Sequence, residues 1–312
     1  MKVLVTGGAG YIGSVVAQQL LRAGHEVIVL DDLSKGHADS VLPGAIWHQG
    51  GLGDAAEVLD PSVDAVIHLA AKSLVGESVE HPERYWHGNV VASLGLIDAM
   101  RAAGVRRMVF SSTAAVYGSP LTETIAEDHP AAPINPYGAS KLAIDHMLSA
   151  EAKAHGLAAV SLRYFNVGGA SDGLSERHDP ETHLIPNLLK AAAGHGGTAK
   201  LFGTDYPTPD GTAVRDYIHI LDLAAAHLQA MEWVAPGTHE VFNLGTGVGS
   251  SVREVIDAVE RVTGRSVPVE EHPRRVGDPA TLVASGQKAR EVLGWQPRHS
   301  LEDIIRDAWN HL

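Results

Sequence analysis

The stretch that decides the fold is Val5-Thr-Gly-Gly-Ala-Gly-Tyr-Ile-Gly13, near the start of a 312-residue chain. It follows the apolar run Val3–Thr6 and leads into the helical spacing of Ile12–Ala23, so it predicts a turn between a strand and a helix. Its glycines, three residues apart, permit a tight turn and let a pyrophosphate approach the helix N-terminus. By itself the triplet is a weak indicator, because plain strand–helix turns are also rich in glycine.

The end of the second strand signal strengthens this interpretation. Glu26–Leu30 runs into Asp31 and Asp32, just where a dinucleotide fold places an acidic residue after its glycine loop. A carboxylate there accepts hydrogen bonds from the adenosine ribose hydroxyls and repels a 2′-phosphate, which favours NAD over NADP. Lys35 is the nearby residue that argues the other way, and the alternative interpretation of Asp31 is a solvated strand end.

Further apolar runs predict strands at Ala65–Leu69, Met108–Ser111 and Ala159–Tyr164, separated by helical patterns at Arg84–Ala103 and Tyr137–His155. Parallel strands need crossover helices, and strands buried on both faces read as continuous apolar runs. The alternation therefore predicts an α/β fold with a doubly wound, parallel, Rossmann-type sheet.

The pattern changes in the second half of the chain. From about Val167 to Asp210 it is broken by Gly, Pro, Asp and His, with one helical segment at Leu184–Ala193. We predict an NAD-binding domain over residues 1–166, with a return of the chain near 213–246, and a smaller substrate-binding lobe over 167–312. Further strands are expected at Val214–Ile220 and Glu240–Leu244, and further helices at Ser251–Val262 and Leu301–Leu312.

Composition excludes several functions. The chain has 37 acidic and 24 basic residues, a net charge of −13, which argues against non-specific binding to nucleic acid or to anionic membranes. It has no cysteine, so disulfides, thiolate nucleophiles and cysteine-ligated metals are excluded. The 18 histidines are scattered, and no metal site or metal hydrolase is predicted. There is no leader pattern and no apolar run near the roughly 20 residues that span a bilayer, so we expect a soluble cytoplasmic protein.

The segment Tyr137-Gly-Ala-Ser-Lys141 places a phenol and an ammonium on the same face of a helix. A lysine there stabilises phenolate and lowers the tyrosine pKa toward the working range, which makes the tyrosine a usable base. The spacing is common by chance, and its position after the Met108–Ser111 strand is what favours a catalytic role. Thr113 lies just beyond that strand, where doubly wound folds bind ligands. Its alternative role is to stabilise a turn.

Nine short segments, spread along essentially the whole chain, carry a resemblance to a known family. They are Val5–Gly13, Leu74–Ser78, Phe110–Gly118, Pro136–Lys141, Leu162–Asn166, Asp205–Gly211, Val214–His219, Asn243–Gly247 and Pro273–Asp278. Together they resemble the extended short-chain dehydrogenase/reductases and, within them, the UDP-glucose (UDP-galactose) 4-epimerases. Asp205–His219 and Arg275–Asp278 are the more specific segments, because they resemble that family's nucleotide-sugar site.

The resemblance implies NAD-dependent interconversion of UDP-glucose and UDP-galactose, an isomerase reaction of galactose metabolism. It makes Tyr137 the base that takes the proton of the sugar 4-OH while C4 passes hydride to NAD. The flat 4-ketose then turns and receives the hydride on its other face. Lys141 becomes the electrostatic partner and ribose ligand, Thr113 a proton shuttle, and Phe165 a neighbour of the nicotinamide. The cofactor residues implied are Gly7, Gly10, Tyr11, Ile12, Gly13, Asp31, Asp32, Leu33, Ser34, Lys35, Gly36, Gly51, Leu52, Leu69, Ala70, Ala71, Ser73, Ser111, Tyr137, Lys141 and Phe165.

The substrate implied is a UDP-sugar. Its predicted contacts are Thr113, Tyr137, Asn166, His183, Leu184, Lys200, Leu201, Phe202, Arg215, Arg275, Asp278 and Leu282. Two arginines suit a pyrophosphate dianion, although either could be an ordinary surface ion pair. The family also implies a homodimer through the helices at 84–103 and 137–155. Leu94, Ile97, Leu142 and Leu148 on those helices could equally serve the monomer core.

The chain departs from the family pattern in three places. Gly51 replaces the usual aspartate near the adenine, so adenine contact is expected from the backbone or from Asp54. Gly88 replaces the first of a usual asparagine pair and leaves Asn89. Ser73 lies where some relatives have a lysine near the cofactor. These changes concern cofactor binding and leave the catalytic groups intact.

Other functions fit less well. A nucleotide-sugar 4,6-dehydratase needs an Asp-Glu pair after the active-site threonine, and here those residues are Ala114 and Ala115. A non-catalytic dinucleotide sensor has no reason to keep Tyr137 with Lys141. Epimerisation of UDP-N-acetylhexosamines or UDP-pentoses remains open, because it depends on the wall of the sugar pocket at Leu282.

Overall fold

The computed structural model describes residues 1–195, 197–275 and 278–312. The chain forms two compact units. The first consists of Met1–Gly118, Pro130–Arg163 and Ala224–Phe242, and the second of Ser119–His129, Tyr164–Leu223 and Asn243–Leu312. The division predicted from sequence differs: it placed Ser119–His129 with the first part and made the return of the chain longer than Ala224–Phe242.

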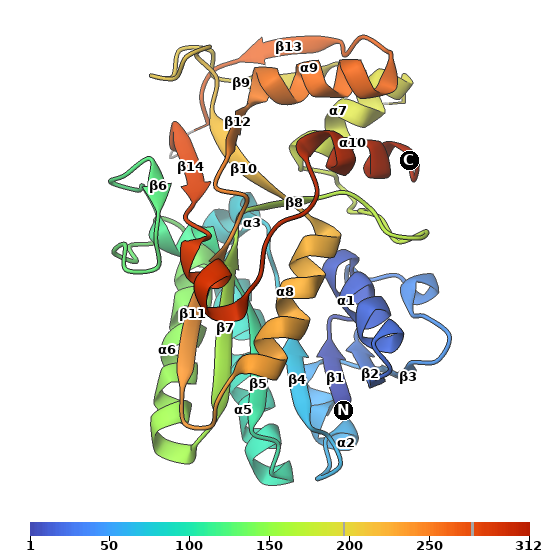
Figure 1. Cartoon of the computed structure of the whole chain (residues 1–312), viewed down its shortest axis with the longest axis vertical. Coiled ribbons are helices and arrows are strands. Elements are labelled where there is room, and N and C mark those ends of the chain that lie inside the picture. The colour runs from blue at the N-terminus through green and yellow to red at the C-terminus, as the bar shows by residue number, and fades with distance from the viewer. Residues whose placement is uncertain (196, 276–277) are drawn as a thin grey trace. The chain divides into compact units, whose positions relative to one another are not determined.

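The first unit is built on a seven-stranded sheet in the order β11-β7-β5-β4-β1-β2-β3 (Figure 1). Strand β1 pairs in parallel with β2 and β4, and the same orientation continues to β3 and β5. The predicted α/β fold with a Rossmann-type sheet is confirmed. The strands are β1 Lys2–Thr6, β2 Glu26–Asp31, β3 Ile46–Gln49, β4 Ala65–His68, β5 Arg107–Thr113, β7 Ala158–Tyr164 and β11 His239–Leu244.

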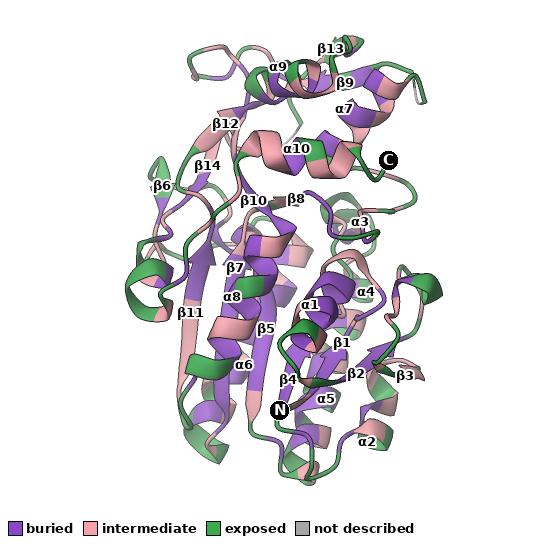
Figure 2. Cartoon of the chain, turned by 45° about the vertical axis from the view of Figure 1, so that its right-hand side comes forward, coloured by how far each residue is buried: buried purple, intermediate pink, exposed green. Residues whose placement is uncertain are grey.

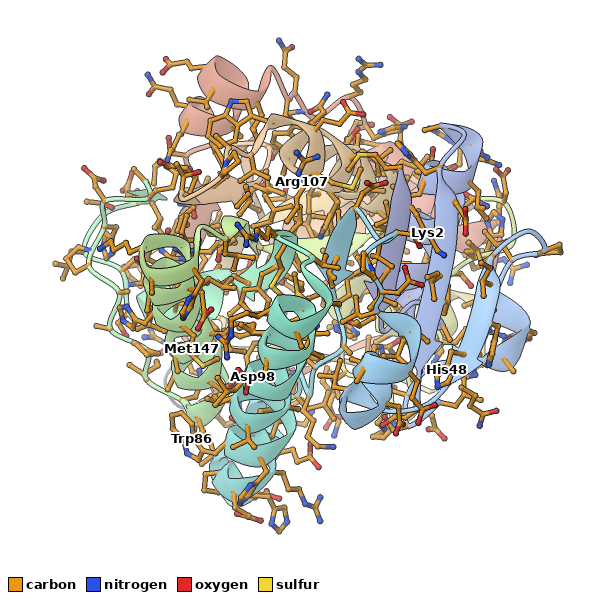
Figure 3. The ribbon with its side chains drawn as sticks, turned by 90° about the horizontal axis from the view of Figure 1, so that it is seen from below. Lys2, His48, Trp86, Asp98, Arg107 and Met147 are labelled. Carbon is orange, nitrogen blue, oxygen red and sulfur yellow. The ribbon has the colours of Figure 1, made fainter. Side chains whose placement is uncertain are left out.

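Helices connect these strands. They are α1 Tyr11–Arg22, α2 Ala55–Val58, α3 Val75–Glu80, α4 Pro82–Tyr85, α5 Ala92–Ala103, α6 Pro136–His155 and α8 Ile220–Trp233, with the π-helical turn η3 Trp86–Val91 and the 3-10 turns η1 Ala38–Ser40, η2 Leu52–Asp54 and η4 Ala114–Tyr117. The continuous helix predicted over Arg84–Ala103 is thus three consecutive pieces. Helices α5 and α6 lie side by side (Figure 3), joined by the ion pair of Arg101 with Glu151.

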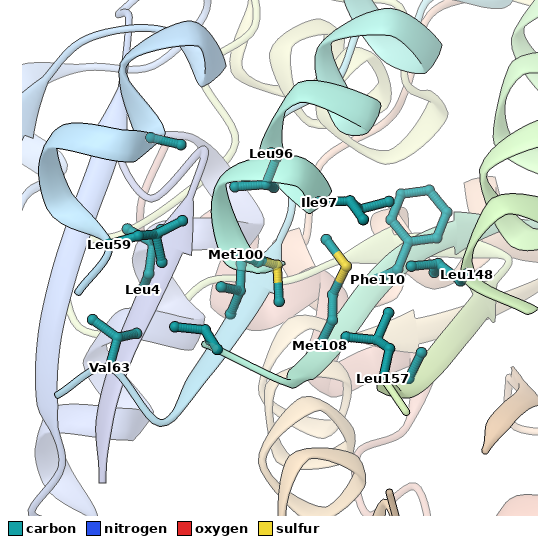
Figure 4. Packing of buried hydrophobic residues seen from close by; sticks show 14 of the residues in the cluster. Leu4, Leu59, Val63, Leu96, Ile97, Met100, Met108, Phe110, Leu148 and Leu157 are labelled. Carbon is teal, nitrogen blue, oxygen red and sulfur yellow. The ribbon is translucent and has the colours of Figure 1, made fainter. Parts of the chain in front are cut away.

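The core of the first unit lies where β4 and β5 meet α5 and α6. Leu96, Met100, Met108, Phe110 and Leu148 are all buried and belong to one cluster (Figure 4). Figure 2 shows the same burial along the central strands. Burial on both faces explains why these strands are continuously apolar in sequence.

The second unit combines small sheets with three helices. One sheet has the order β12-β10-β14-β6, with β8 also paired to β10, and β9 pairs separately with β13. Its elements are β6 Thr124–Ile125, β8 Asn166–Gly168, α7 Leu184–Ala193, β9 Ala199–Phe202, β10 Val214–His219, β12 Gly249–Ser251, α9 Val252–Thr263, β13 Val269–His272, β14 Thr281–Ala284, the π-helical turn η5 Ala289–Leu293 and α10 Leu301–Trp309. Helices α7, α9 and α10 share one apolar core. Along the described ranges, no helix has both the length and the apolar character that a membrane span requires.

Candidate active site

The glycine loop after β1 has a conformation that only glycine allows. Gly7 has a φ of +73°, and a Cβ added there would lie 2.7 Å from the Ala70 backbone nitrogen. A Cβ at Gly13 would lie 2.0 Å from the Gly7 carbonyl oxygen. Helix α1 begins after Gly10, which has no side chain to cap it. The N-terminus of α1 therefore has no N-cap side chain in front of it, an arrangement that fits a pyrophosphate.

Asp31 at the end of β2 is 8% exposed, so it is not a solvated strand end. Its Oδ2 accepts a hydrogen bond from Ala9 N at 2.9 Å, and its Oδ1 accepts one from Leu33 N at 2.8 Å. Burial, reinforced by the charge of Asp32, raises its pKa above the usual range despite those two bonds. The carboxylate thus ties the glycine loop to the turn after β2, a role that sequence reasoning did not assign, and its ribose contact remains a prediction.

The other candidate cofactor residues of the first unit follow neighbouring strand ends. Leu33 to Gly36 form the turn after β2, and a Cβ at Gly36 would lie 2.8 Å from Asp31 Oδ1. Gly51 and Leu52 follow β3, and Asp54 Oδ2 accepts from Gly51 N at 2.8 Å. Asp54 therefore holds its own turn, which favours the backbone over this carboxylate as the adenine contact.

Tyr137 lies in the first turn of α6. The helix begins after Asn135, whose Oδ1 accepts a hydrogen bond from Gly138 N at 2.8 Å. Tyr137 is partly buried, and burial raises the pKa of its phenol. A hydrogen bond with the Thr113 side chain acts in the opposite direction and lowers that pKa. Thr113 Oγ1 also accepts from Ala115 N at 3.2 Å, so one hydroxyl both stabilises the turn η4 and contacts the phenol.

Lys141 is 2% exposed, one helical turn after Tyr137. Its Nζ donates to the Ser111 carbonyl oxygen at 2.8 Å and lies 4.8 Å from the centre of the Phe110 ring. Burial lowers the pKa of Lys141 to about 7, with the charge of Asp145 opposing the change. The expectation that this lysine lowers the Tyr137 pKa stays a prediction, because the causes that act on that pKa in the structure are burial, which raises it, and Thr113, which lowers it.

Sequence reasoning missed three residues that shape this site. His68, 1% exposed, lies between Thr6 Oγ1 at 2.7 Å and Ser93 Oγ at 2.9 Å. Burial and the charge of Lys141 lower the pKa of His68 to about 3, so the imidazole is neutral. A histidine at the end of a buried apolar strand was the signal for it.

The other two missed residues support Tyr137 through its helix and its ring. Tyr85 packs edge-on against Tyr137, with ring centres 6.3 Å apart, and its hydroxyl donates to Leu74 O at 2.6 Å. Asn89, noted in the sequence only as the remaining residue of a pair, donates through Nδ2 to Ser140 Oγ at 3.0 Å and to Lys72 O at 3.0 Å. It thereby fixes the start of α6 to the segment after β4.

The two departures from the family pattern at Ser73 and Gly88 are connected through Lys72, the residue before Ser73. A Cβ at Gly88 would lie 3.1 Å from Lys72 Cε, so the glycine leaves room for the Lys72 side chain. The positive charge of Lys72 contributes to a lowered pKa at Glu77. This segment therefore carries a lysine one residue before the position where the family pattern has it.

The second unit holds most of the substrate candidates. Arg215 on β10 forms an ion pair with Asp278, and it lies opposite Leu282 in the β10–β14 register. The Arg275 guanidinium lies 4.1 Å from the centre of the Phe202 ring. Of these five candidates, Arg215 therefore pairs with Asp278 and Arg275 with Phe202. Leu282 is the strand neighbour of Arg215.

Other candidates of the second unit are placed differently. Leu201 is 1% exposed and belongs to the core, so only its backbone is available, whereas Lys200 beside it is exposed. Asn166 Nδ2 donates to Asp216 O at 3.2 Å. Phe165 is also in this unit, while the glycine loop is in the first. Val276 and Gly277, within the Pro273–Asp278 motif, lie outside the described residues.

A glycine loop at a helix N-terminus and a Tyr-x-x-x-Lys pair beside a threonine, on one parallel sheet, define a dinucleotide-dependent dehydrogenase or epimerase. The sequence profile of the NAD dependent epimerase/dehydratase family matches residues 3–245. The chain belongs to this family.

Individual relatives within this family are similar to the chain over nearly its whole length. The chain is 54% identical over 312 residues to a UDP-glucose 4-epimerase of Corynebacterium glutamicum, covering 99% of this chain and 95% of that protein. A UDP-glucose 4-epimerase of Streptomyces lividans is also 54% identical, with the same coverage. The crystal structure of UDP-glucose 4-epimerase from Brucella ovis in complex with NAD is 46% identical, with a TM-score of 0.95 and coverage of 99% and 98%. The Bifidobacterium longum enzyme in complex with NAD+ and UDP has a TM-score of 0.92 at 36% identity, covering 100% of this chain and 98% of that one.

Proposed function

We propose that this chain interconverts UDP-glucose and UDP-galactose, with NAD as its resident cofactor. The observation that carries the proposal is Tyr137 in the first turn of α6, with Lys141 buried one turn further on, in a chain that resembles UDP-glucose 4-epimerases over almost its whole length. Those relatives are UDP-glucose 4-epimerases, and solved structures of such enzymes hold NAD, UDP or UDP-glucose.

The residues present fit NAD. The glycine loop would hold the pyrophosphate, because a Cβ at Gly7 or Gly13 would collide with backbone. Asp31, fixed by Ala9 and Leu33, would receive the adenosine ribose. When bound, NAD supplies a hydride acceptor at its nicotinamide ring.

The chain's own side chains accept the proton of the sugar 4-OH and bind the UDP portion of the substrate. Tyr137 accepts the proton of the sugar 4-OH, and the Thr113 hydroxyl fixes its phenol oxygen. Lys141, held by Ser111 O, has a pKa near 7, so its charge responds to charges that arrive beside it. Arg215 and Arg275 supply local positive charge for the UDP pyrophosphate in an acidic protein. Binding at the nucleotide end leaves the sugar free to turn.

Incubation of the purified protein with UDP-galactose and no other addition tests this function. We expect UDP-glucose to form until the two sugars reach equilibrium. Unchanged UDP-galactose in the presence of a folded, NAD-loaded protein would contradict the proposal. A 4-keto-6-deoxy product would instead assign the dehydratase reaction.

We expect the protein to carry NAD or NADH when purified without added cofactor. A reaction that returns the hydride in every turnover gives no reason to release the cofactor, and the glycine loop and Asp31 would retain it. Denaturing the protein and assaying the supernatant for both redox forms measures this. A preparation that contains neither form and remains inactive after NAD is added would refute tight binding.

We also propose a homodimer. Trp86, Val91 and Leu94 of η3 and α5 are 41%, 56% and 44% exposed, an apolar surface that suits a partner subunit. Ile97 and Leu148, by contrast, are buried in the monomer core.

The dimer is tested with Leu94→Glu. We expect light scattering to report a dimer for the parent protein and a monomer for this variant, because a charge in an apolar interface is costly to desolvate. Ile46→Glu is the matched control, since Ile46 is 50% exposed on β3 and should leave the dimer intact. A parent protein that is monomeric at micromolar concentration rejects the dimer.

Sugar choice is expected to depend on Leu282. This residue is partly buried and lies opposite Arg215 in the strand register, outside the apolar core cluster of its unit. We expect efficient turnover of UDP-glucose and UDP-galactose, and slower turnover of the N-acetylated pair by about tens- to hundreds-fold, the scale on which apolar pockets discriminate.

Two substitutions separate a specificity role for Leu282 from a packing role. Leu282→Tyr should reduce the ratio of N-acetylated to plain sugar turnover, and Leu282→Ser should increase it. A ratio that stays flat while both variants lose thermal stability would assign Leu282 to packing alone.

A further inference from the structure

A cluster of histidine and glutamate side chains lies in the loop that precedes α7. Glu176, His178 and His183 each offer one ligand atom, and these atoms lie within 4.8 Å of one another. His178 Nδ1 is in contact with Glu176 Oε1, and His183 Nδ1 lies 3.9 Å from Glu176 Oε2. The two imidazole rings have centres 5.5 Å apart. The sequence had grouped these histidines with the scattered ones, and the loop brings them together.

A buried fourth side chain, Glu181, lies next to this cluster. Glu181 has one oxygen, Oε1, at 2.7 Å from His183 Nδ1, and its side chain is only 4% exposed. The other oxygen, Oε2, is buried and has no hydrogen-bond partner among the residues that the structure describes. Leaving a buried carboxylate oxygen unpartnered is costly, and a cation bound beside Glu181 would remove that cost.

The donor set identifies the kind of cation. Mg²⁺ and Ca²⁺ prefer ligand sets made only of oxygen, whereas two imidazoles with carboxylates suit Zn²⁺ and its neighbours. Zinc takes four ligands at about 2.0–2.2 Å, so ligand atoms on opposite sides of the ion lie about 4 Å apart or less. The ligand atoms of Glu176, His178 and His183, within 4.8 Å of one another, are close to this geometry, whereas Glu181 lies outside that group and its side chain would have to rotate to reach the ion.

We propose that Glu176, His178, Glu181 and His183 form a binding site for one zinc ion. The ion would neutralise two glutamates within one short loop and replace the internal contacts of the histidines. His183 is the residue directly before α7, where no side chain caps the helix. Zinc would therefore fix the entry to α7 and the backbone that presents Leu184. Because His183 and Leu184 are also predicted substrate contacts, the ion would order a segment that is expected to adjoin the UDP-sugar.

Metal binding is measured on full-length protein without a histidine tag, treated with a chelator and then dialysed against ZnCl₂. We expect about one zinc per chain by elemental analysis, and a calorimetric titration with Zn²⁺ of matching stoichiometry. Co²⁺ in place of Zn²⁺ should give the intense visible absorption of a four-coordinate ion. Zinc in excess of its Kd should also raise the melting temperature, because it binds only the folded state.

Two substitutions assign the ligands. His178→Ala and Glu181→Gln should each weaken zinc binding by about 10–100-fold or more, a range set by the loss of even a supporting partner of a metal ligand. Glu181→Gln keeps the size and shape of the side chain, so it is expected to fold normally. His81→Ala is the control, because His81 pairs with Glu83 at 3.6 Å and is not one of the clustered residues Glu176, His178 and His183.

The same measurements can overturn the proposal. Parent protein that retains no zinc after dialysis contradicts it. So does zinc binding that is unchanged in both variants, or weakened equally in His81→Ala. If His178→Ala fails to fold, Glu181→Gln with a circular dichroism spectrum like that of the parent decides the question alone.

Discussion

Replacing Tyr137 with phenylalanine is expected to lower turnover by about 10²–10⁴-fold, the usual contribution of a general acid–base group. The substitution keeps the ring and its edge-on contact with Tyr85, whose ring centre is 6.3 Å away. It removes only the hydroxyl, and with it the hydrogen bond to Thr113. Binding of UDP, measured by calorimetry, should stay close to that of the parent protein.

Tyr85→Phe is the matched control for this experiment. It removes a second phenol oxygen beside the site, one that bonds to Leu74 O and Glu77 rather than to Thr113. Its effect on turnover should be far smaller than that of Tyr137→Phe. Near-normal turnover in Tyr137→Phe, or equal losses in both variants, would remove Tyr137 from the role of base.

Lys141→Met is expected to reduce turnover strongly and to stabilise the fold at neutral pH. Burial lowers the pKa of Lys141 from the usual 10.5 to about 7 in the folded protein. Between these values the unfolded chain binds one proton more than the native protein, so stability rises with pH across this range. At or below pH 7 the native protein carries the full cost of a buried ammonium, of the order of a few kcal/mol. Methionine has no such cost.

The stability of the two proteins is compared by urea unfolding between pH 7 and pH 10. The advantage of Lys141→Met should be largest at pH 7 and shrink as the pH rises. Its residual activity should have a pH profile shifted upward, because the phenolate loses a nearby cation. A constant difference in stability would contradict the lowered lysine pKa, and an unshifted activity profile would make the lysine structural.

The parts of the fold that were predictable from sequence are those with a local signal. The glycine loop, α6 and α7 were placed to within a residue or two, because strand–turn–helix boundaries and amphipathic spacing lie within short windows. Helix α8 was missed for the opposite reason. Leu223, Ala224, Ala226, Ala230 and Met231 are all fully buried, so the helix has few polar residues to give a 3.6-residue period.

The site was only partly predictable, because several of its contacts join distant segments. Thr6 and His68 bond across 62 positions of sequence, and Arg215 and Asp278 pair across 63. The motif around each residue indicated a function but not its partner. Thr113 illustrates the limit: a ligand-facing role and a turn-stabilising role were both open from sequence, and the structure shows its Oγ1 bonded to Ala115 N in the turn η4, while the ligand-facing role stays a prediction.

The strand β3 was missed because it is a short edge strand. Its first residue, Ile46, is 50% exposed, and its four residues show no apolar run. Register with β2 through pairs such as Ile28 with Ile46 is what makes it a strand. Such pairing is a property of the folded sheet that a local window does not contain.

The central claim is that C4 of the sugar is oxidised and then reduced with its own hydrogen. Proton NMR of UDP-galactose incubated with the protein alone in deuterated water tests it most directly. The account predicts that UDP-glucose forms and that its C4 position keeps protium, because the hydride comes from the substrate and the solvent exchanges only the hydroxyl proton. Deuterium at C4, or the absence of UDP-glucose with folded NAD-loaded protein, would contradict it.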